Sequence, residues 1–600
     1  MVNDIICVIF FSQVRYFITM KKIIRMMLND ALNGWNEIDS VCFNQMDYQI
    51  DVTKNKQHGD YATNVALIIA KRLKKNPRDI ALELVKRINF DSKVNKVDIA
   101  GPGFINFFID HGFVQRQLND FYINEKYDIQ LNKKQTVVID YSSPNIAKEM
   151  HVGNLRSTII GDAITRVLDF MGYCVIRQNH VGDWGTQFGM LLAYFETLKL
   201  ENKQDFEVKD LEAFYREAKK RFDSDENFAL KARTMVVALQ SGDTYCVKLW
   251  KELYQISVDY IQNVYAKLGV LLTLEDMKGE STYNDDLPTV IALLEQQHLI
   301  VEDDGAKCVF LEEFKNKEGN ITPIIVQKKG GGYLYSTTDL AAIRYRVNVL
   351  KANRLIYLVD QRQGLHFEQV FLLARKAHFL PNDVEAEHFG FGTMNGEDGR
   401  PFKTRTGGTV KLIELLDEAK KRALETVEEK RKDLSKEEKE HIASVIGMSA
   451  IKYADLSKNR HSDYIFSFDR MLSFEGNTAP YLLYAYTRCA KLLIKAESIV
   501  LDWSLCIENY HFHEKEWVVA NKLLQFNTVI CSVAKTGMPH LLCTYLYELA
   551  TAFSSLYENL SIFSEENDDI KVMRLKLVFL TARTLKTSLS LLGINVLEKM

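Results

Sequence analysis

A polar segment between two apolar stretches carries the first residues that could do chemistry. It reads S-S-P-N-I-A-K-E-M-H-V-G-N-L-R over residues 142–156. His151 and Asn154 can donate hydrogen bonds to phosphate oxygens, Lys148 supplies a mobile positive charge, and Gly153 allows close approach to the backbone. The start of a following helix would add free N–H groups that favour an anion. The segment indicates a phosphate site, but a polar turn with Asn154 as helix cap would use the same residues.

A second candidate site lies much later, at G-T-M-N-G-E-D-G-R-P-F-K-T-R-T-G-G-T-V-K-L over residues 392–412. Its glycines permit movement, while Arg400, Lys403 and Arg405 supply positive charge. Such a loop can close over a triphosphate and stabilise charge that develops during phosphoryl or nucleotidyl transfer. Alone it could be a solvated basic loop. Together with the first segment it favours nucleotide chemistry.

The elements around these residues are typical of a nucleotide-binding sheet. T-V-V-I-D at 136–140 predicts a buried strand, and apolar residues three and four apart predict a helix over 155–170. A charged helical stretch at about 200–320 interrupts the pattern. Further strands are predicted at residues 171–181, 321–327 and 354–360. We therefore expect an α/β fold, a Rossmann-type doubly wound parallel sheet split by a helical insertion, with ligands at the carboxyl ends of its strands.

The two ends of the chain show different patterns. Residues 71–88 predict two helical pieces broken at Asn76 and Pro77, and residues 97–110 predict two strands around a Gly-Pro-Gly turn. These indicate a small α+β module. From about residue 440 helical periodicity dominates, which predicts a helix bundle whose tyrosines either pack inside or stack on bases. The first 20 residues lack the basic start and cleavage site of a secretion signal, so we interpret them as an N-terminal extension.

Composition limits the class of protein. With 600 residues the chain is too long for one hydrophobic core, and 47% hydrophobic with 26% charged residues is ordinary for a globular protein. A net charge of -3 gives no overall basic character, so nucleic-acid binding would need a local positive surface. The 9 cysteines form no C-x-x-C pair. This argues against a zinc ribbon or a disulfide framework and favours a reducing, cytoplasmic location.

Both candidate sites resemble those of a known enzyme class. H-V-G-N at 151–154 and F-K-T-R-T at 402–406 resemble the HIGH and KMSKS elements of class I aminoacyl-tRNA synthetases. Longer segments narrow the resemblance to arginyl-tRNA synthetase, and they cover nearly the whole chain after the extension. They are residues 101–109, 142–162, 179–191, 333–342, 399–412 and 591–600.

The resemblance implies an arginine–tRNA ligase. Such an enzyme joins L-arginine to ATP as arginyl-adenylate, then passes the arginyl group to the 3′ end of tRNA(Arg), releasing pyrophosphate and AMP. The chemistry requires positioning and positive charge more than an acid–base pair. Mg²⁺ is implied as the counter-ion of ATP, with no structural metal. A cytoplasmic monomer without membrane contact is expected.

The resemblance also assigns roles to the two loops. The implied catalytic and ATP-binding residues are Lys148, His151, Gly153, Asn154, Lys403 and Arg405. Asn154 replaces the second histidine of HIGH and keeps a hydrogen-bonding amide. Phe402 and Arg405 stand where the class has the lysines of KMSKS, and Lys148, just upstream of His151, would compensate.

Selection of arginine requires acceptors for a planar guanidinium, which a carboxylate can bind in bidentate fashion. Tyr335 and Asp339 share one face of a helical turn. The resemblance implies that Asp339 binds the guanidinium, with Tyr335 packed and hydrogen-bonded beside it, although Asp339 alone could be a helix N-cap. The other implied arginine-binding residues are Asp140, Ser143, Asn145, His151 and Gln363.

Contacts with tRNA are implied at both ends of the chain. The N-terminal module would touch the tRNA elbow, with Asn106 and Phe108 as candidates. The C-terminal bundle would read the anticodon loop through Tyr484, Arg488 and Met600. The segment V-G-D-W-G-T-Q-F-G, with Asp183 and Trp184, is expected to support the site without taking part in a step.

Five segments are expected along the chain. They are the extension (1–20), an N-terminal tRNA-contacting module (21–118), the catalytic domain (119–400), the KMSKS-like loop with connecting helices (401–445) and an anticodon-binding domain (446–600). Three alternatives stay open: a class I synthetase for lysine or cysteine, a synthetase-like module that binds tRNA or arginine without catalysis, and a non-tRNA nucleotidyltransferase. The retained cations argue against the second, and the tyrosine-rich helical end argues against the third.

Overall fold

The computed structural model describes most of the chain as two compact units. The first comprises residues 1–130, 488–531 and 545–585, and the second comprises residues 131–487, 532–544 and 586–600. The described residues are 20–33, 35, 48–53, 56–90, 92–123, 135–184, 187–200, 211–315, 319–400, 410–497 and 510–600. None of the helices in these ranges is both long enough and apolar enough to cross a membrane.

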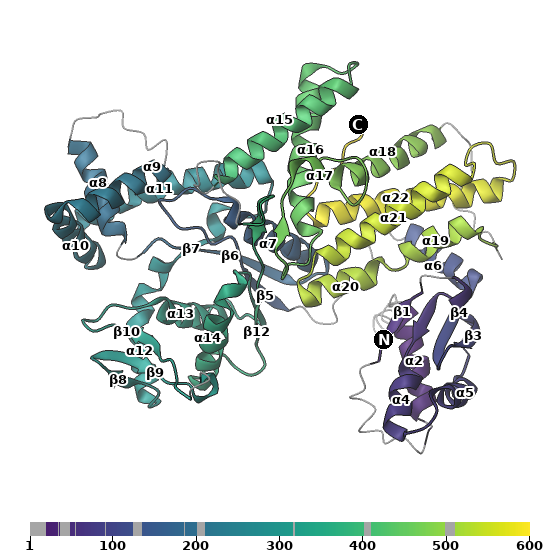
Figure 1. The fold of residues 1–600 in the computed structure, drawn as a ribbon, viewed down its shortest axis with the longest axis horizontal. Coiled ribbons are helices and arrows are strands. Elements are labelled where there is room, and N and C mark those ends of the chain that lie inside the picture. The colour runs from purple at the N-terminus through teal and green to yellow at the C-terminus, as the bar shows by residue number, and fades with distance from the viewer. Residues whose placement is uncertain are drawn as a thin grey trace, which may run out of the picture. The chain divides into compact units, whose positions relative to one another are not determined.

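A five-stranded parallel sheet forms the centre of the second unit (Figure 1). Its strands are β5 (Thr136–Asp140), β6 (Cys174–Val181), β7 (Met277–Gly279), β11 (Arg354–Tyr357) and β12 (Glu385–His388). The strand order is β12-β11-β5-β6-β7, so the chain builds outward from β5 in one direction and then in the other. The sheet therefore reverses its strand order between β5 and β11, where doubly wound sheets bind ligands. The predicted fold class is confirmed.

Helices cover this sheet and explain why β5 is apolar. Val138 of β5 lies in one hydrophobic cluster with residues of α12 (Leu287–Gln296), α13 (Tyr335–Asn348) and α14 (Gly364–Lys376). Helix α7 (Val152–Phe170) follows β5 and is buried along most of its length. Strands with helices on both faces have no polar face to present, which matches the continuous apolar run of β5. The strand and helix predicted on either side of the polar segment are confirmed.

The predicted helical insertion was wrong in its extent. Its helices are α8 (Gln187–Leu200), α9 (Leu211–Ser224), α10 (Glu226–Gln240) and α11 (Thr244–Leu268). After Leu268 the chain returns to the main sheet as β7 and then forms two further strands, β8 (Val301–Asp303) and β9 (Ala306–Val309). The helical part of the insertion therefore ends well before residue 320.

The strand predicted at 321–327 is present as β10 (Ile324–Gln327), but it pairs antiparallel with β9 in a separate three-stranded sheet. Ile324 and Val326 are buried, whereas Ile325 between them is 40% exposed. That alternation suits an antiparallel sheet with one face toward the core. The expectation that this strand joins the parallel sheet was wrong.

Two long helices continue the second unit after the main sheet. They are α15 (Leu412–Lys430) and α16 (Lys436–Leu456), and Ser435 with Glu438 forms a capping box at the start of α16. Between them and the C-terminal helices lie α17 (Phe468–Met471) and β14 (Tyr464–Ile465), which pairs with β13 (Met394–Asn395). A buried ion pair between Arg156 and Asp455, 3.0 Å apart, joins α7 to α16.

The predicted helical end of the chain is confirmed. Its helices are α18 (Ala479–Ala496), α19 (Glu514–Leu523), α20 (Phe526–Thr536), α21 (His540–Asn559) and α22 (Asp568–Leu591). Residues 586–600, which comprise the last part of α22 and the short segment after it, belong to the second unit.

The N-terminal module is a four-stranded antiparallel sheet with helices, in strand order β1-β2-β4-β3. Asn76 caps α5 by accepting a hydrogen bond from the Arg78 N–H, with Pro77 at the first helical position, so the predicted helix break is confirmed. The strands around the Gly-Pro-Gly turn are confirmed as well. The elements are α2 (Met20–Asn33), β1 (Ile50–Val52), β2 (Tyr61–Thr63), α4 (Val65–Leu73), α5 (Pro77–Arg87), β3 (Val94–Ala100), β4 (Phe104–Ile109) and α6 (His111–Ile123).

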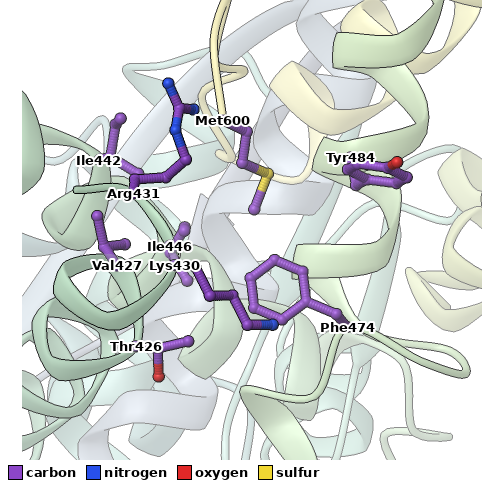
Figure 2. Close-up of a pocket in the computed structure, with 9 residues that line it drawn as sticks. All are labelled: Thr426, Val427, Lys430, Arg431, Ile442, Ile446, Phe474, Tyr484 and Met600. Atoms are coloured by element: carbon purple, nitrogen blue, oxygen red, sulfur yellow. The ribbon is translucent and has the colours of Figure 1, made fainter. Parts of the chain in front are cut away.

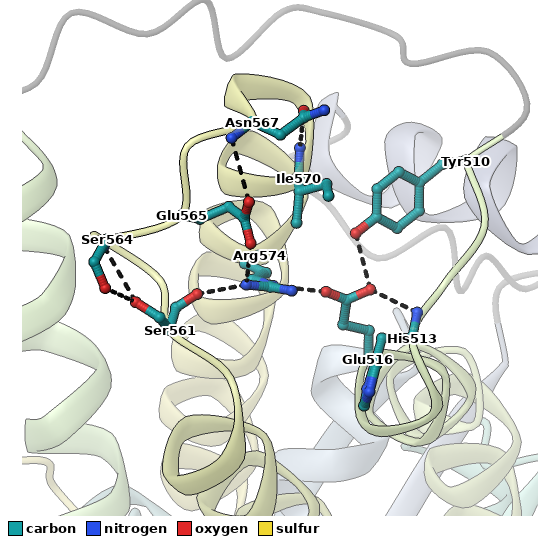
Figure 3. A network of polar contacts seen from close by, with 9 residues as sticks. All are labelled: Tyr510, His513, Glu516, Ser561, Ser564, Glu565, Asn567, Ile570 and Arg574. Atoms are coloured by element: carbon teal, nitrogen blue, oxygen red, sulfur yellow. Dashed lines mark hydrogen bonds and ion pairs between the residues drawn. The ribbon is translucent and has the colours of Figure 1, made fainter.

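A buried polar network holds the helices of the first unit together (Figure 3). The Glu516 carboxylate accepts hydrogen bonds from Tyr510 Oη at 2.8 Å, from the His513 N–H at 2.8 Å and from Arg574 Nε at 2.7 Å. Arg574 also donates to Glu565 at 2.9 Å. Because several donors meet its charge, the carboxylate can be buried without an unsatisfied oxygen.

Candidate active site

The polar loop after β5 has an unusual backbone. Ser142, Ser143 and Ala147 all have left-handed conformations, with φ of 73°, 45° and 61°. Residues with a Cβ rarely adopt this region, and each instance costs about 1–3 kcal/mol unless the surroundings hold it. Backbone strain of this kind is concentrated at functional sites.

Buried polar partners hold the loop in this conformation. Ser142 Oγ lies 2.7 Å from both Thr158 Oγ1 and Tyr265 Oη. The Ser143 N–H donates to Asn179 Oδ1 at 2.9 Å, and the Ala147 N–H donates to Ser257 Oγ at 3.0 Å. Tyr265 and Ser257 belong to α11, so the helical insertion fixes the shape of the loop.

His151 is the N-cap of α7. Its Nδ1 accepts the Gly153 N–H at 3.0 Å, while Asn154 Oδ1 accepts the His151 N–H at 3.0 Å. In the neutral ring an accepting Nδ1 leaves Nε2 as the donor, which suits a phosphate oxygen. A Cβ at Gly153 would lie 2.7 Å from the His151 ring, so glycine is required here by the histidine itself. The alternative with Asn154 as the cap was wrong, because Asn154 is the reciprocal partner.

The described end of the second candidate segment, residues 410–412, pairs with the polar loop after β5. The Val152 N–H donates to the Val410 carbonyl at 3.1 Å, and the Leu412 N–H donates to the Met150 carbonyl at 2.9 Å. The Lys411 ammonium lies 3.0 Å from the Glu149 carboxylate. These contacts hold together two segments that are distant in the chain. Lys403 and Arg405, with Phe402, lie outside the described residues.

Asp140 at the end of β5 is buried and fully engaged. One of its oxygens accepts from Arg346 at 2.6 Å, and the other accepts from Ser143 Oγ at 3.0 Å. Arg346, 1% exposed, also donates to Gln178 at 2.7 Å. Because both oxygens have partners, Asp140 fixes Ser143 and α13 rather than offering an open carboxylate.

Asp339 lies in the second turn of α13 and pairs with His366 of α14, whose Nε2 is 2.7 Å from Asp339 Oδ2. The N-cap of α13 is Leu334, so the alternative of Asp339 as a cap was wrong. Tyr335, the first residue of the helix, is 73% exposed. A carboxylate and an accessible tyrosine on one helix face can receive a planar cation.

Glu280 is a carboxylate that the sequence reasoning missed. Burial, together with the negative charges of Asp183 and Asp339, raises its pKa to about 7. Glu280 directly follows β7 and therefore lies at the same edge of the sheet as the loops described above. The only sequence signal was the three-residue strand before it, which is too short to recognise by pattern.

Asn145 and Gln363 follow β5 and β11, the strands that flank the reversal point of the sheet. Both residues are exposed. Asn145 lies against Gly182, where an added Cβ would come within 2.4 Å of its Oδ1, and Gln363 is the N-cap of α14. These positions allow both amides to face a ligand at the sheet edge.

Asp183 and Trp184 follow the carboxyl end of β6. Asp183 accepts from the Ser281 N–H at 3.0 Å and from Ser281 Oγ at 2.6 Å, and its carbonyl accepts from Trp250 at 2.9 Å. Trp184 contacts Trp250 edge-on, with ring centres 6.0 Å apart. Through these contacts Asp183 links the end of β6 to the segment after β7.

A second candidate site is a pocket of about 280 Å³ in the second unit (Figure 2). Tyr484, which is 47% exposed, and Met600 both line it, although more than a hundred residues separate them. The Lys430 ammonium lies 4.2 Å from the centre of the Phe474 ring. Its lining residues are Thr426, Val427, Lys430, Arg431, Ile442, Ile446, Phe474, Tyr484 and Met600. Aromatic walls with cations nearby suit a nucleobase.

The C-terminal segment reaches this pocket along a fixed path. Gly593 has a φ of +68°, and its carbonyl accepts from the buried Lys452 Nζ at 2.5 Å. Further on, the Leu597 carbonyl accepts from Thr487 Oγ1 at 3.0 Å. Both contacts fix the approach of the chain end to Met600.

The remaining candidates lie in the first unit. Asn106 is 3% exposed and therefore offers little side-chain surface to a partner. Phe108 is half-buried, with the Lys96 ammonium 5.2 Å from its ring centre. The Arg488 guanidinium lies 4.9 Å from the centre of the Tyr557 ring.

Family models match almost the whole chain. Residues 19–109 match "Arginyl tRNA synthetase N terminal domain", residues 117–468 match "tRNA synthetases class I (R), catalytic domain", and residues 482–600 match "DALR anticodon binding domain".

Relatives and solved structures agree with these matches. An arginine–tRNA ligase of Shewanella woodyi is 57% identical over 555 residues, which cover 92% of this chain and 95% of that protein. One of Shewanella sediminis is 58% identical over the same shares. The arginyl-tRNA synthetase of Plasmodium falciparum is similar in structure, with a TM-score of 0.81, 31% identity and coverage of 96% of this chain and 99% of its own.

The arginyl-tRNA synthetase of Thermus thermophilus has the same fold, with a TM-score of 0.80 at 24% identity, covering 97% of this chain and 100% of its own. Sequence matches over three consecutive parts of the chain thus accompany a parallel sheet whose carboxyl edge carries a strained polar loop. The chain belongs to the arginyl-tRNA synthetases, the class I enzymes that attach arginine to tRNA with the use of ATP.

Proposed function

We propose that the loop after β5 and the segment that pairs with it bind ATP during arginine activation. In that step a carboxylate oxygen of arginine bonds to the α-phosphorus of ATP, and the bond from this phosphorus to the pyrophosphate oxygen breaks. His151 Nε2 and Asn154 would donate to phosphate oxygens, while Gly153 lets the ligand approach. Lys148, Lys403 and Arg405 would balance the charge that develops.

The observation that carries this proposal is the pairing of residues 150–152 with residues 410–412. Lys403 and Arg405 precede the paired segment by only a few residues. Because the segment that follows them is paired beside His151, we propose that these cations act on the same phosphates. The strained backbone from Ser142 to Ala147 supports the same interpretation.

The arginine side chain would be bound by Asp339 with Tyr335 beside it, and we add Glu280 as a second carboxylate. Two negative groups around a guanidinium favour arginine, since its fork of donors can satisfy both, whereas an ammonium cannot span them. Ser143, Asn145, Gln363 and His151 would bind the α-amino and carboxylate groups. Asp140 would act indirectly by orienting Ser143.

Mg²⁺ would accompany ATP. Among the described residues no group of three or more His, Cys, Asp or Glu side chains is placed to hold a metal ion. Mg²⁺ bound mainly through phosphates and water needs no such cage. Its positive charge would supplement that of the lysines and arginines when the pyrophosphate leaves.

We assign the pocket around Met600 to the anticodon loop of tRNA. Tyr484 and Phe474 offer faces for an unstacked base, and Lys430 and Arg431 offer positive charge for the backbone. Arg488 would contact the same loop. In the N-terminal module Phe108 with Lys96 is a better candidate for the tRNA elbow than the buried Asn106. The second chemical step transfers the arginyl carbonyl to a ribose hydroxyl of the tRNA, with AMP as the leaving group.

The proposed enzyme is a cytoplasmic monomer. Its parts are an N-terminal extension (1–20), a tRNA-contacting module (21–118), a catalytic domain (119–400), a loop with connecting helices (401–445) and an anticodon-binding domain (446–600). The three matched family models, at residues 19–109, 117–468 and 482–600, support a division into three main parts.

ATP–pyrophosphate exchange with each of the twenty amino acids, with and without total tRNA, tests the assignment of the pocket. We expect exchange with arginine alone. Exchange with lysine as well would show that Asp339, Tyr335 and Glu280 do not form a guanidinium-selective pocket. Sedimentation of the purified protein tests whether it is a monomer.

A further inference from the structure

Lys148 has a specific partner outside the nucleotide-binding sheet. Its ammonium lies 4.3 Å from the centre of the Tyr215 ring. Tyr215 belongs to α9 of the helical insertion, whereas Lys148 ends the strained loop after β5. A cation at this distance from an aromatic face is attracted by the ring quadrupole.

The loop backbone is already fixed by the same insertion. Ser257 and Tyr265 of α11 hold Ala147 and Ser142. The backbone does not fix the position of the long Lys148 side chain. This side chain has about 2 kcal/mol of rotamer entropy. The contact with Tyr215 supplies that missing restraint.

The partner is a ring rather than a carboxylate. Within the described residues Lys148 forms no ion pair, and the adjacent carboxylate, Glu149, is engaged by Lys411. A carboxylate would neutralise the ammonium and would compete with an incoming phosphate. An aromatic face restrains the ammonium and leaves its charge available.

Tyr215 is itself well supported. Its neighbour Phe214 is 4% exposed and packs against Tyr194 and Phe195 of α8, with ring centres 5.2 Å and 6.2 Å apart. This packing anchors α9 beside α8, while the half-buried Tyr215 faces Lys148. The ring is therefore held by the insertion and not by the loop that it restrains.

We infer that Tyr215 is a positioning residue for Lys148: it holds the ammonium beside the ATP-binding loop while the lysine acts on the phosphates. The inference rests on the proposed role of Lys148 in adenylate formation. It gives the helical insertion a part in the first chemical step. Neither the ring nor its hydroxyl contacts substrate.

The test is the rate of arginyl-adenylate formation, measured with saturating arginine, ATP and tRNA. Tyr215→Leu should slow it roughly two- to thirtyfold, the range expected for loss of a cation–π contact. Tyr215→Phe keeps the ring face and should retain the wild-type rate, and KM for arginine should be unchanged in both. Phe222→Leu, an aromatic change on the same helix, is the matched control and should have no effect.

A double-mutant cycle with Lys148→Met identifies the cause. If the contact matters, Tyr215→Leu should cause no further loss once Lys148 is replaced. An equal loss in both backgrounds, or a Tyr215→Phe variant as slow as Tyr215→Leu, would overturn the inference. If Lys148→Met itself had the wild-type rate, the proposed catalytic role of Lys148 would fail first, so the two failures are distinguishable.

Discussion

The loop after β5 and the pocket around Met600 are built in opposite ways. The loop is a strained backbone held by single hydrogen bonds from buried Ser, Thr, Tyr and Asn side chains, and it places donors and charges at defined points. The pocket is walled mainly by apolar and aromatic side chains, with two cations at its edge.

This difference agrees with the ligands that we propose for the two regions. Charge that develops on phosphate oxygens is stabilised best by groups already fixed at short range. A nucleobase that leaves its stack gains most from contact with a flat apolar face, which tolerates small displacements. We therefore expect single substitutions near the loop to cost more than those in the pocket, and the following experiments test this, from the largest effect to the smallest.

Arg346→Met should be the most damaging change. It leaves Asp140 buried without its partner, which costs about 3–5 kcal/mol in the stability of the second unit. Arg344→Met on the same helix is the control, because the pair of Arg344 with Asp286 is more exposed and should contribute at most about 1 kcal/mol. Urea unfolding followed by fluorescence measures both. Equal midpoints for the two variants would show that the buried pair does not hold the loop.

Asp339→Ala should raise KM for arginine roughly 30-fold to several thousandfold, since a desolvated carboxylate that binds a cation contributes about 2–5 kcal/mol. KM for ATP should stay near the wild-type value. Steady-state aminoacylation with each substrate varied in turn gives both constants. A rise in KM for ATP with no change in KM for arginine would show that Asp339 does not bind arginine.

Lys148→Ala should slow adenylate formation about 10²- to 10³-fold, as expected for loss of one fixed group that stabilises developing charge. Affinity for arginine should change little, because the lysine is assigned to phosphate. Rapid-quench measurement of a single turnover gives the rate. Lys219→Ala, an exposed lysine on α9 paired with Asp223, is the control. Equal rates for the Lys148 variant and the wild type would remove this lysine from the mechanism.

Tyr484→Ala should raise KM for tRNA roughly 5- to 150-fold, the effect of losing one base-stacking contact of about 1–3 kcal/mol. Tyr484→Phe keeps the ring and should behave as wild type. Adenylate formation at saturating tRNA should be unchanged in both variants. If Tyr484→Ala kept the wild-type KM, the pocket would not bind the anticodon loop.

The pH dependence of arginine binding should be the smallest effect. With a pKa of about 7, Glu280 is mostly protonated near pH 6 and mostly ionised near pH 8. A cation binds the ionised form better, so KM for arginine should fall as pH rises across this range, by at most about tenfold. Glu280→Gln should flatten the profile. An unchanged slope in that variant would assign the titration to another group.

Local patterns in the sequence were sufficient for several elements. The β-branched run before Ser142 and the helical period after His151 predicted β5 and α7 correctly, since each signal lies within one element. Asn76 followed by Pro77 likewise predicted a helix boundary. These features depend on neighbours in the chain, so no tertiary information was needed.

Other features could not be predicted because the sequence carries no signal for the partner. Arg346, which pairs with Asp140, lies 206 residues further along the chain. β10 was recognised as a strand, yet which sheet it joins depends on β9. Glu280 matters only because β7 returns to the sheet edge after the helices.

The sequence by itself determined that a polar loop lies between a buried strand and an amphipathic helix. Together with its resemblance, it also determined which enzyme family carries that loop. The tertiary structure decided which charges are buried in pairs and which are exposed, how α11 holds the strained loop, and that Tyr484 and Met600 share one pocket. The reason is physical: helix and strand preferences act between neighbours, whereas desolvation and charge pairing depend on groups that only folding brings together.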